Sequence, residues 1–117
     1  MARLAAHVRV SAYLARLAAA GIPAHLVHRG DATAGAISVK LAFMDGRASY
    51  HTRGLGPSGR LEWLPLVEAG PEAEADAAIA RQRRADPDLW VIEVEDPRGR
   101  AMREVLDEME GPDGLAG

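Results

Sequence analysis

The chain has 117 residues, 48% of them hydrophobic and 26% charged, with a formal net charge of −3 and no cysteine. This length fits one compact domain with its own core, and the composition is too apolar for a disordered chain. The absence of cysteine excludes a disulfide framework and a thiolate nucleophile and favours a cytoplasmic location, while the acidic balance disfavours nucleic-acid binding.

The first predicted element is a helix over residues 3–20. Arg9 and Arg16 lie on a side that we interpret as a solvated face or a contact for an acidic partner surface. Gly21 suits the left-handed position past a helix end, and Pro23 prevents the helix from resuming. The apolar face of this helix has the spacing i, i+3, i+4, i+7: Val10, Tyr13, Leu14 and Leu17. An organellar transit peptide is an alternative for this arginine-rich, acid-poor start, although it holds a single serine.

The clearest local signal is a β-hairpin, which follows a short strand predicted over residues 24–29. Apolar and polar residues alternate from residue 36 to 43, and Asp45-Gly46 is typical of a two-residue turn. A two-residue turn sets a register in which the apolar side chains share one face of the hairpin and the polar side chains share the other, wet face. It sets these cross-strand pairs: Leu41 with Tyr50 on the apolar face and Lys40 with His51 on the wet face.

Two more strands and two helices follow. A strand is predicted over residues 60–67, where Pro65 indicates an edge or a bulge. Pro71 is placed to open a second helix, with acids in its first turns and arginines in its last. A half-buried strand is predicted over residues 90–95, and the spacing of apolar residues predicts a third helix over 102–109.

This order predicts an α+β fold: a mostly antiparallel sheet of four to five strands, with three helices packed against one face. Residues 1–110 are expected to form a single domain, and residues 111–117 a flexible C-terminal tail. We expect no membrane span, because no apolar run is long enough.

The segment from His28 to Ala36 gathers several side chains that could carry chemistry. His28 and Asp31 are a candidate catalytic pair, since a histidine titrates near neutrality and a carboxylate can orient it. The alternative is that Asp31 caps a turn and His28 is a half-buried strand residue. Gly30 and Gly35 bracket a loop whose amides, with Arg29, could hold a small anion. Alternatively, the glycines are there for a positive φ.

A second polar segment runs from Asp86 to Asp96. Glu93 and Glu95 are expected on one strand face, which raises metal or two-carboxylate chemistry. The alternative is that the aspartates cap turns and the glutamates pair with arginines or face water. Histidines show no metal-ligand spacing, so no metal site and no cofactor are predicted. Trp63 and Trp90 either stack on a ligand or, as we favour, fill the core.

Several segments together resemble the bacterial domain of unknown function 1491 family. The most specific are Gly30-Asp31-x-x-Ala34-Gly35 and Asp86-Pro87-Asp88-Leu89-Trp90. The likeness extends over nearly the whole chain and keeps the order of the segments. It implies a small cytoplasmic bacterial protein and carries no assigned reaction, ligand or partner.

Our leading interpretation is a non-enzymatic binding or protein-interaction module that self-associates or docks a partner protein. The alternative is a small ligand-binding protein or an acid/base enzyme, with a small anion as ligand. Its site would form where the His28–Gly35 loop meets the Asp86–Glu95 segment. The candidate residues are His28 and Asp31 for catalysis and, for ligand binding, Arg29, Gly30, Gly35, Trp90 and Glu93.

Overall fold

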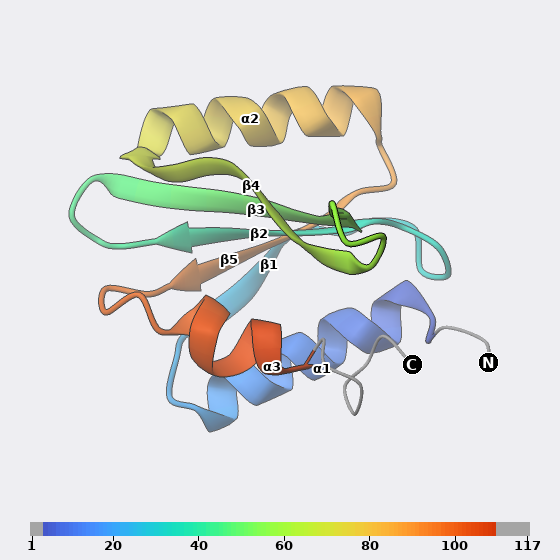
Figure 1. The fold of residues 1–117 in the computed structure, drawn as a ribbon, viewed down its shortest axis with the longest axis horizontal. Coiled ribbons are helices and arrows are strands. Elements are labelled where there is room, and N and C mark those ends of the chain that lie inside the picture. The colour runs from blue at the N-terminus through green and yellow to red at the C-terminus, as the bar shows by residue number, and fades with distance from the viewer. Residues whose placement is uncertain (1–3, 110–117) are drawn as a thin grey trace.

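The structure is a computed structural model that describes residues 4–109. The predicted flexible tail over 111–117 lies outside the described residues. Figure 1 shows one sheet between helices. The elements follow in the order α1 (Ala6–Ala19), β1 (Ala24–His28), β2 (Ile37–Ala42), β3 (Arg47–Leu55), β4 (Leu61–Pro71), α2 (Glu72–Ala85), β5 (Trp90–Glu95), the π-helix η1 (Met102–Leu106) and α3 (Asp107–Met109).

The five strands form one sheet in the order β1-β5-β2-β3-β4. Neighbouring strands are antiparallel except β2 and β5, which run parallel. The prediction of an α+β fold with a mostly antiparallel sheet is therefore confirmed. As Pro65 indicated, β4 is an edge strand, and its pairing with β3 shifts register near that residue.

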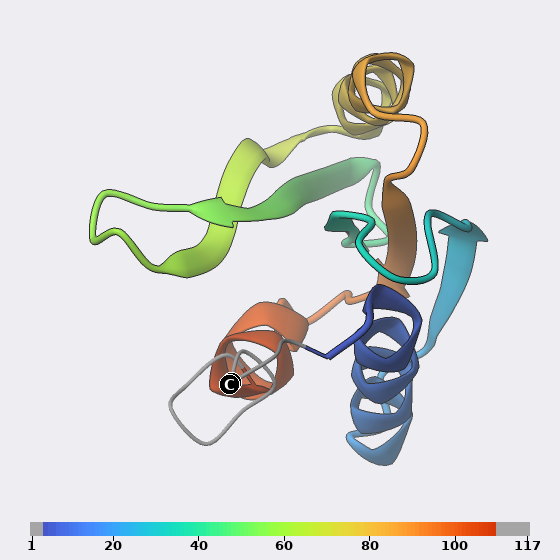
Figure 2. The same cartoon turned by 90° about the vertical axis from the view of Figure 1, so that its right-hand side faces the viewer.

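Helices cover both faces of the sheet, which corrects the prediction that they pack against one face. Figure 2 shows α2 on one side and α1 with α3 on the other. On the α1 side, Tyr13 and Leu17 pack in one core with Val39 and Ile92. On the α2 side, small residues let the helix lie close to the sheet: Ala48, Tyr50 and Val91 pack against Ala75, Ala78 and Ile79.

The predicted register of the hairpin was wrong by one residue. Leu41 pairs with Ser49, and Lys40 pairs with Tyr50. The connection is a three-residue loop, because the amide of Phe43 donates to the carbonyl of Arg47 at 3.1 Å. Met44 and Gly46 both take a positive φ there, at 65° and 91°. A one-residue shift turns every β3 side chain to the other face.

The predicted wet face of β2 was also wrong, because all six residues of β2 are buried. The strand lies between β5 and β3, and helices cover it from above and below. Both tryptophans are core residues as predicted, with Trp63 7% and Trp90 1% exposed. Gly21 adopts a φ of 76° just past α1, also as predicted.

Candidate functional site

The two most specific sequence segments meet in space and bind each other. The indole N–H of Trp90 donates to the carbonyl of Asp31 at 2.7 Å, and the Asp31 amide donates to the Asp88 carbonyl at 3.0 Å. The Trp90 amide donates to Ala36 at 2.8 Å. The loop after β1 is therefore fastened to the start of β5, and we call this set of contacts the Asp31–Trp90 lock.

The carboxylate of Asp31 is used inside its own loop. Its Oδ2 accepts from the amides of Thr33 at 3.1 Å and Ala34 at 2.8 Å, and the Gly35 amide donates to the Asp31 carbonyl at 3.2 Å. These are amides that the sequence analysis offered to an anion. Asp31 thus caps the turn, and Asp86 does the same by accepting from the Asp88 amide at 3.1 Å.

Gly30 and Gly35 are needed for space, not for a positive φ. A Cβ on Gly30 would lie 2.6 Å from the Trp90 ring, and one on Gly35 would lie 2.8 Å from Trp90 Nε1. Both would also overlap the carbonyl oxygen of Asp88. Neither glycine is among the described residues with a positive φ. The expectation of a left-handed backbone is corrected to one of close packing.

His28 and Arg29 lie next to the lock. The Asp31 carboxylate accepts from the amides of Thr33 and Ala34 and not from His28 or Arg29. His28 pairs with Val91 at the end of β1. Burial lowers the pKa of His28, and the positive charge of Arg83 lowers it further. The Arg29 guanidinium lies 5.3 Å from the centre of the Trp90 ring, a cation–π contact.

Glu93 belongs to a different cluster, on the α2 side of the sheet. There Lys40, the only lysine of the sequence, is 5% exposed and contacts three carboxylates. Its Nζ lies 2.8 Å from Asp76, 3.1 Å from Glu72 and 3.4 Å from Glu93. Burial alone lowers the pKa of Lys40, but the bonds to Asp76 and Glu72 and the charge of Glu93 outweigh it and raise that pKa.

A cavity on the α1 side of the sheet is lined both by residues of the loop after β1 and by two buried arginines. It has a volume of about 320 Å³ and is lined by the loop residues 33–36, by Arg9 from α1 and by Arg53 from β3. Arg9 is 5% exposed and Arg53 9% exposed. We call it the arginine cavity. Burial of Arg9 corrects the prediction of a solvated side chain.

Aromatic side chains hold both guanidinium groups in place. Arg9 Nη2 donates to the Tyr13 hydroxyl at 3.0 Å, and the Arg53 guanidinium lies 5.2 Å from the centre of the Trp63 ring. Tyr13 and Trp63 pack edge to face, with their ring centres 5.6 Å apart. The two arginines are thus positioned by one connected aromatic pair.

Sequence reasoning missed Arg53 and Lys40 as buried charges and set His51 aside. His51 precedes Arg53 by two residues on β3, and its Nδ1 is buried without a hydrogen-bond partner. Burial lowers the pKa of His51, which the charges of Glu68 and Asp107 partly offset. The signal in the sequence was weak, because alternation within β3 does not show which face a helix covers.

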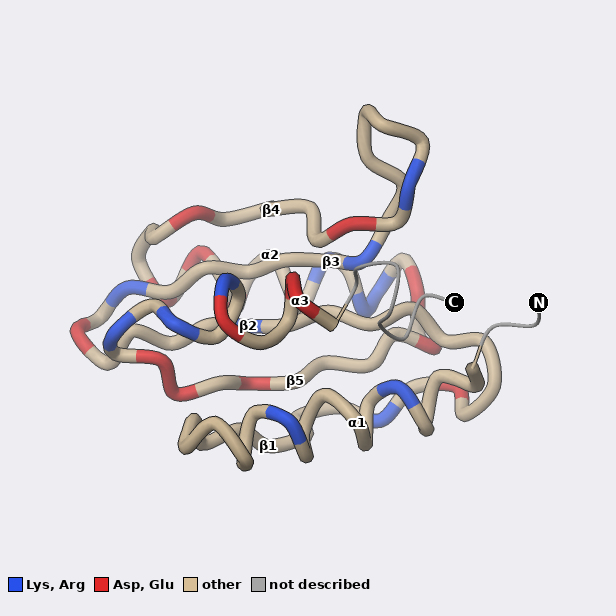
Figure 3. The backbone as a smooth tube through the Cα atoms, turned by 60° about the horizontal axis from the view of Figure 1, so that its bottom comes forward, with Lys and Arg blue, Asp and Glu red and all other residues tan. Residues whose placement is uncertain are grey.

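Charge and membrane features complete the description. Figure 3 shows basic but no acidic residues on α1, whereas the charged residues of β5 are acidic. Among residues 4–109, no group of three or more histidine, aspartate or glutamate side chains is arranged to hold a metal ion. Within the same range, no helix has the length and apolar character needed to cross a membrane.

Residues 4–104 match the family model described as Protein of unknown function (DUF1491). The chain belongs to the DUF1491 family. A crystal structure of a DUF1491 family protein from Caulobacter crescentus CB15 is 33% identical, with a TM-score of 0.76 over 87% of this chain and 96% of that chain. An NMR structure of a DUF1491 family protein from the same organism is 32% identical, with a TM-score of 0.76 over 90% and 96%.

The solution structure of protein Atu0922 from A. tumefaciens is 30% identical, with a TM-score of 0.70 over 80% of this chain and 86% of that chain. No match was found among curated proteins. The resemblance noted in the sequence is therefore confirmed, and the DUF1491 description itself states no function.

Proposed function

We propose that this DUF1491 protein is a non-enzymatic module that binds a small anionic ligand in the arginine cavity. The observation that carries the proposal is the placement of two buried guanidinium groups, Arg9 and Arg53, on the wall of one cavity. Among the described residues that line it, none is acidic. The cavity volume of about 320 Å³ suits a ligand of a few heavy atoms up to a small metabolite.

Guanidinium groups are well matched to this task. Each presents a planar fork of N–H donors that fits a carboxylate or phosphate with two parallel hydrogen bonds. Burial strengthens such contacts, because the effective dielectric constant falls away from bulk water. The stacking of Arg53 on Trp63 and the bond from Arg9 to Tyr13 reduce the entropy lost on binding.

The Asp31–Trp90 lock has a supporting role in this proposal. It holds residues 33–36, which line the arginine cavity together with Arg53. The loop also accepts from the first amides of α1, from Ala6 to Thr33 at 3.0 Å and from His7 to Ala32 at 2.9 Å. The loop therefore also fixes the start of the helix that carries Arg9.

A cytoplasmic location and self-association or a partner protein remain part of the proposal. The lack of cysteine supports the first. The second stays a prediction that a solution mass measurement would check, with a dimer or a co-purifying protein expected.

Calorimetry and thermal melting with phosphate, sulfate and propionate test the proposal at constant ionic strength. At least one anion should bind and stabilise the fold, by about 2.7 kcal/mol at a hundredfold excess over its dissociation constant. Arg53→Gln should weaken that binding about tenfold, which corresponds to ~1.4 kcal/mol.

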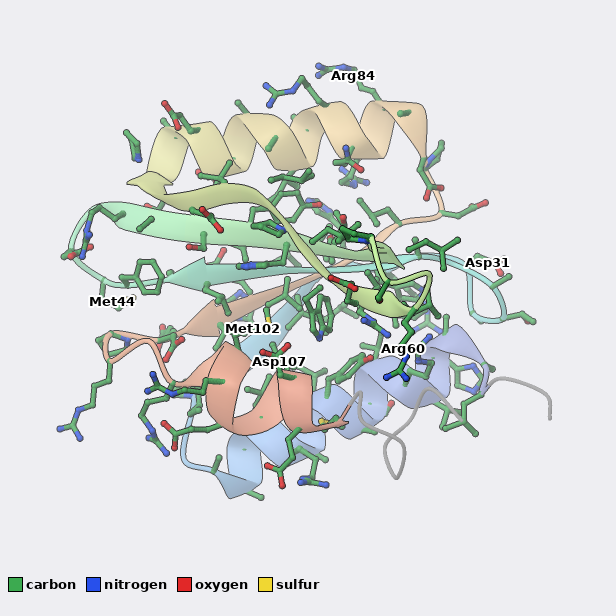
Figure 4. The ribbon with its side chains drawn as sticks, in the orientation of Figure 1. Asp31, Met44, Arg60, Arg84, Met102 and Asp107 are labelled. Atoms are coloured by element: carbon green, nitrogen blue, oxygen red, sulfur yellow. The ribbon has the colours of Figure 1, made fainter. Side chains whose placement is uncertain are left out.

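Arg84→Gln is the matched control. Arg84 lies on α2, across the sheet from the cavity, and points away from the sheet in Figure 4. Removing the same charge there should leave anion affinity within about twofold of wild type, because exposed charges far from a site are screened by salt. No binding of any of the three anions, or equal losses in the two variants, would overturn the proposal.

A further inference from the structure

We infer that the indole N–H of Trp63 is a second ligand-recognition group, which reads an uncharged hydrogen-bond acceptor at the far end of the anion. This inference rests on the proposed function, since it extends the same ligand from the arginine cavity into a neighbouring one. The ligand class is a small carboxylic acid, or comparable anion, that also carries an amide or similar neutral acceptor.

A second cavity adjoins the first. It has a volume of about 420 Å³, and it shares two lining residues, Arg53 and Leu61, with the arginine cavity. Its other walls include Trp63 of β4 and Asp107 of α3. Figure 2 shows the β3–β4 hairpin projecting on the same side of the molecule as α3. Because both cavities are lined by Arg53 and Leu61, the inferred ligand would extend from one to the other past these residues.

Trp63 carries a buried donor with no acceptor. The side chain is 7% exposed, and its Nε1 has no hydrogen-bond partner. Buried polar groups nearly always have a partner, because leaving one unpaired costs about 1–3 kcal/mol. Tyr13 and Arg53 pack against the ring and hold it in place. An acceptor atom on a ligand would remove this cost.

The other tryptophan provides the contrast within the same chain. Trp90 Nε1 donates to the Asp31 carbonyl at 2.7 Å, so its bonding capacity is already used within the fold. Trp90 is even more deeply buried than Trp63, and its indole N–H is paired within the fold. Of the two indole groups, only that of Trp63 is unpaired, and the Trp63 residue lines the second cavity.

The charges around the second cavity select a neutral group. Arg53 and Arg60 contribute positive charge, while Glu62 and Asp107 contribute negative charge. Figure 4 places Arg60 on the hairpin and Asp107 on α3. A second anionic group would approach the two carboxylates, whereas an amide offers an acceptor oxygen to the indole and N–H donors to the acids.

Three probes separate these possibilities: propionate, and the two longer acids succinamate and succinate, which are matched in size to each other. All three carry the carboxylate for the arginine cavity, and they end in a methyl group, a neutral amide and a second carboxylate. Succinamate should bind about tenfold more tightly than propionate, since one added hydrogen bond to a buried donor contributes ~1.4 kcal/mol. Succinate should bind more weakly than succinamate.

Nuclear magnetic resonance of the two ¹⁵N-labelled indole groups gives the direct readout without a variant. Succinamate should move the Trp63 Nε1–H signal downfield and slow its exchange with water, while propionate leaves its exchange unchanged. The Trp90 signal is an internal reference, because its N–H is already bonded within the lock. Trp63→Phe assigns the signals and, where its melting curve shows a folded protein, should reduce the preference for succinamate to less than about twofold.

The two proposals fail in different ways. If none of the probes binds, the proposed anion function is overturned, and this inference falls with it. If the carboxylates bind but succinamate is no tighter than propionate and the Trp63 signal stays in place, only the role of Trp63 is overturned.

Discussion

Gly35 has no room for a side chain, so the smallest substitution there tests the Asp31–Trp90 lock. Gly35→Ala would press a methyl group against Trp90 Nε1 and the Asp88 carbonyl. We expect the free energy of unfolding to fall by about 1–3 kcal/mol, the usual cost of overpacking. Urea unfolding followed by tryptophan fluorescence measures it.

Ala32→Ser is a matched control in the same loop. The Ala32 side chain is exposed, so this change should stay within about 0.5 kcal/mol of wild type. A Gly35→Ala protein as stable as the control would show that the loop moves away from Trp90 at little cost.

Lys40 makes a pH-dependent contribution to stability. Its pKa is raised above its ordinary value of 10.5, so the folded state holds the proton more tightly than the unfolded chain. The contribution is therefore fully present below pH 10.5 and is lost as the pH rises toward the folded-state pKa.

Comparison with Lys40→Met isolates this effect. The difference in unfolding free energy between wild type and Lys40→Met should be constant from about pH 8 to pH 10 and shift against wild type above that range. Taking the difference removes the contribution of tyrosine ionisation to the unfolding free energy, because both proteins contain the same tyrosines. A difference that already changes near neutral pH would argue against a Lys40 held charged by its three carboxylates.

Among the elements, β2 and β4 should differ most clearly in backbone protection. β2 lies inside the sheet with every residue buried, whereas β4 is an edge strand in which several residues are exposed. Hydrogen exchange should therefore be slowest in β2, close to the rate of global unfolding, and faster in β4. Equal protection of both strands would indicate that another chain or segment covers the β4 edge.

The elements themselves could be predicted well from the sequence, but their pairing could not. Helical spacing placed α1, and the alternation of residues placed β2 and β5. The register of β2 against β3 was missed, because Met44 takes a positive φ of 65° and lengthens the turn by one residue. A non-glycine residue rarely adopts that conformation, so the two-residue turn was the better prediction.

For the whole molecule, the arginine cavity depends on elements that are far apart in the chain. Arg9 comes from α1, Arg53 from β3 and the remaining wall from residues 33–36. The sequence analysis singled out the loop, including Gly35, as ligand-binding. It did not single out the arginines, because an arginine beside an apolar helix face is more often solvated than buried.

The sequence by itself determined the secondary structure, the α+β class and the DUF1491 resemblance, because these depend on local spacing, turn residues and the order of segments. Only the tertiary structure decided that α2 covers the second face, that Lys40 is enclosed by carboxylates, and that Arg9 and Arg53 share a cavity. The physical reason is that burial and charge pairing depend on which elements cover each face of the sheet. That choice is made by contacts between distant residues, which local patterns do not encode.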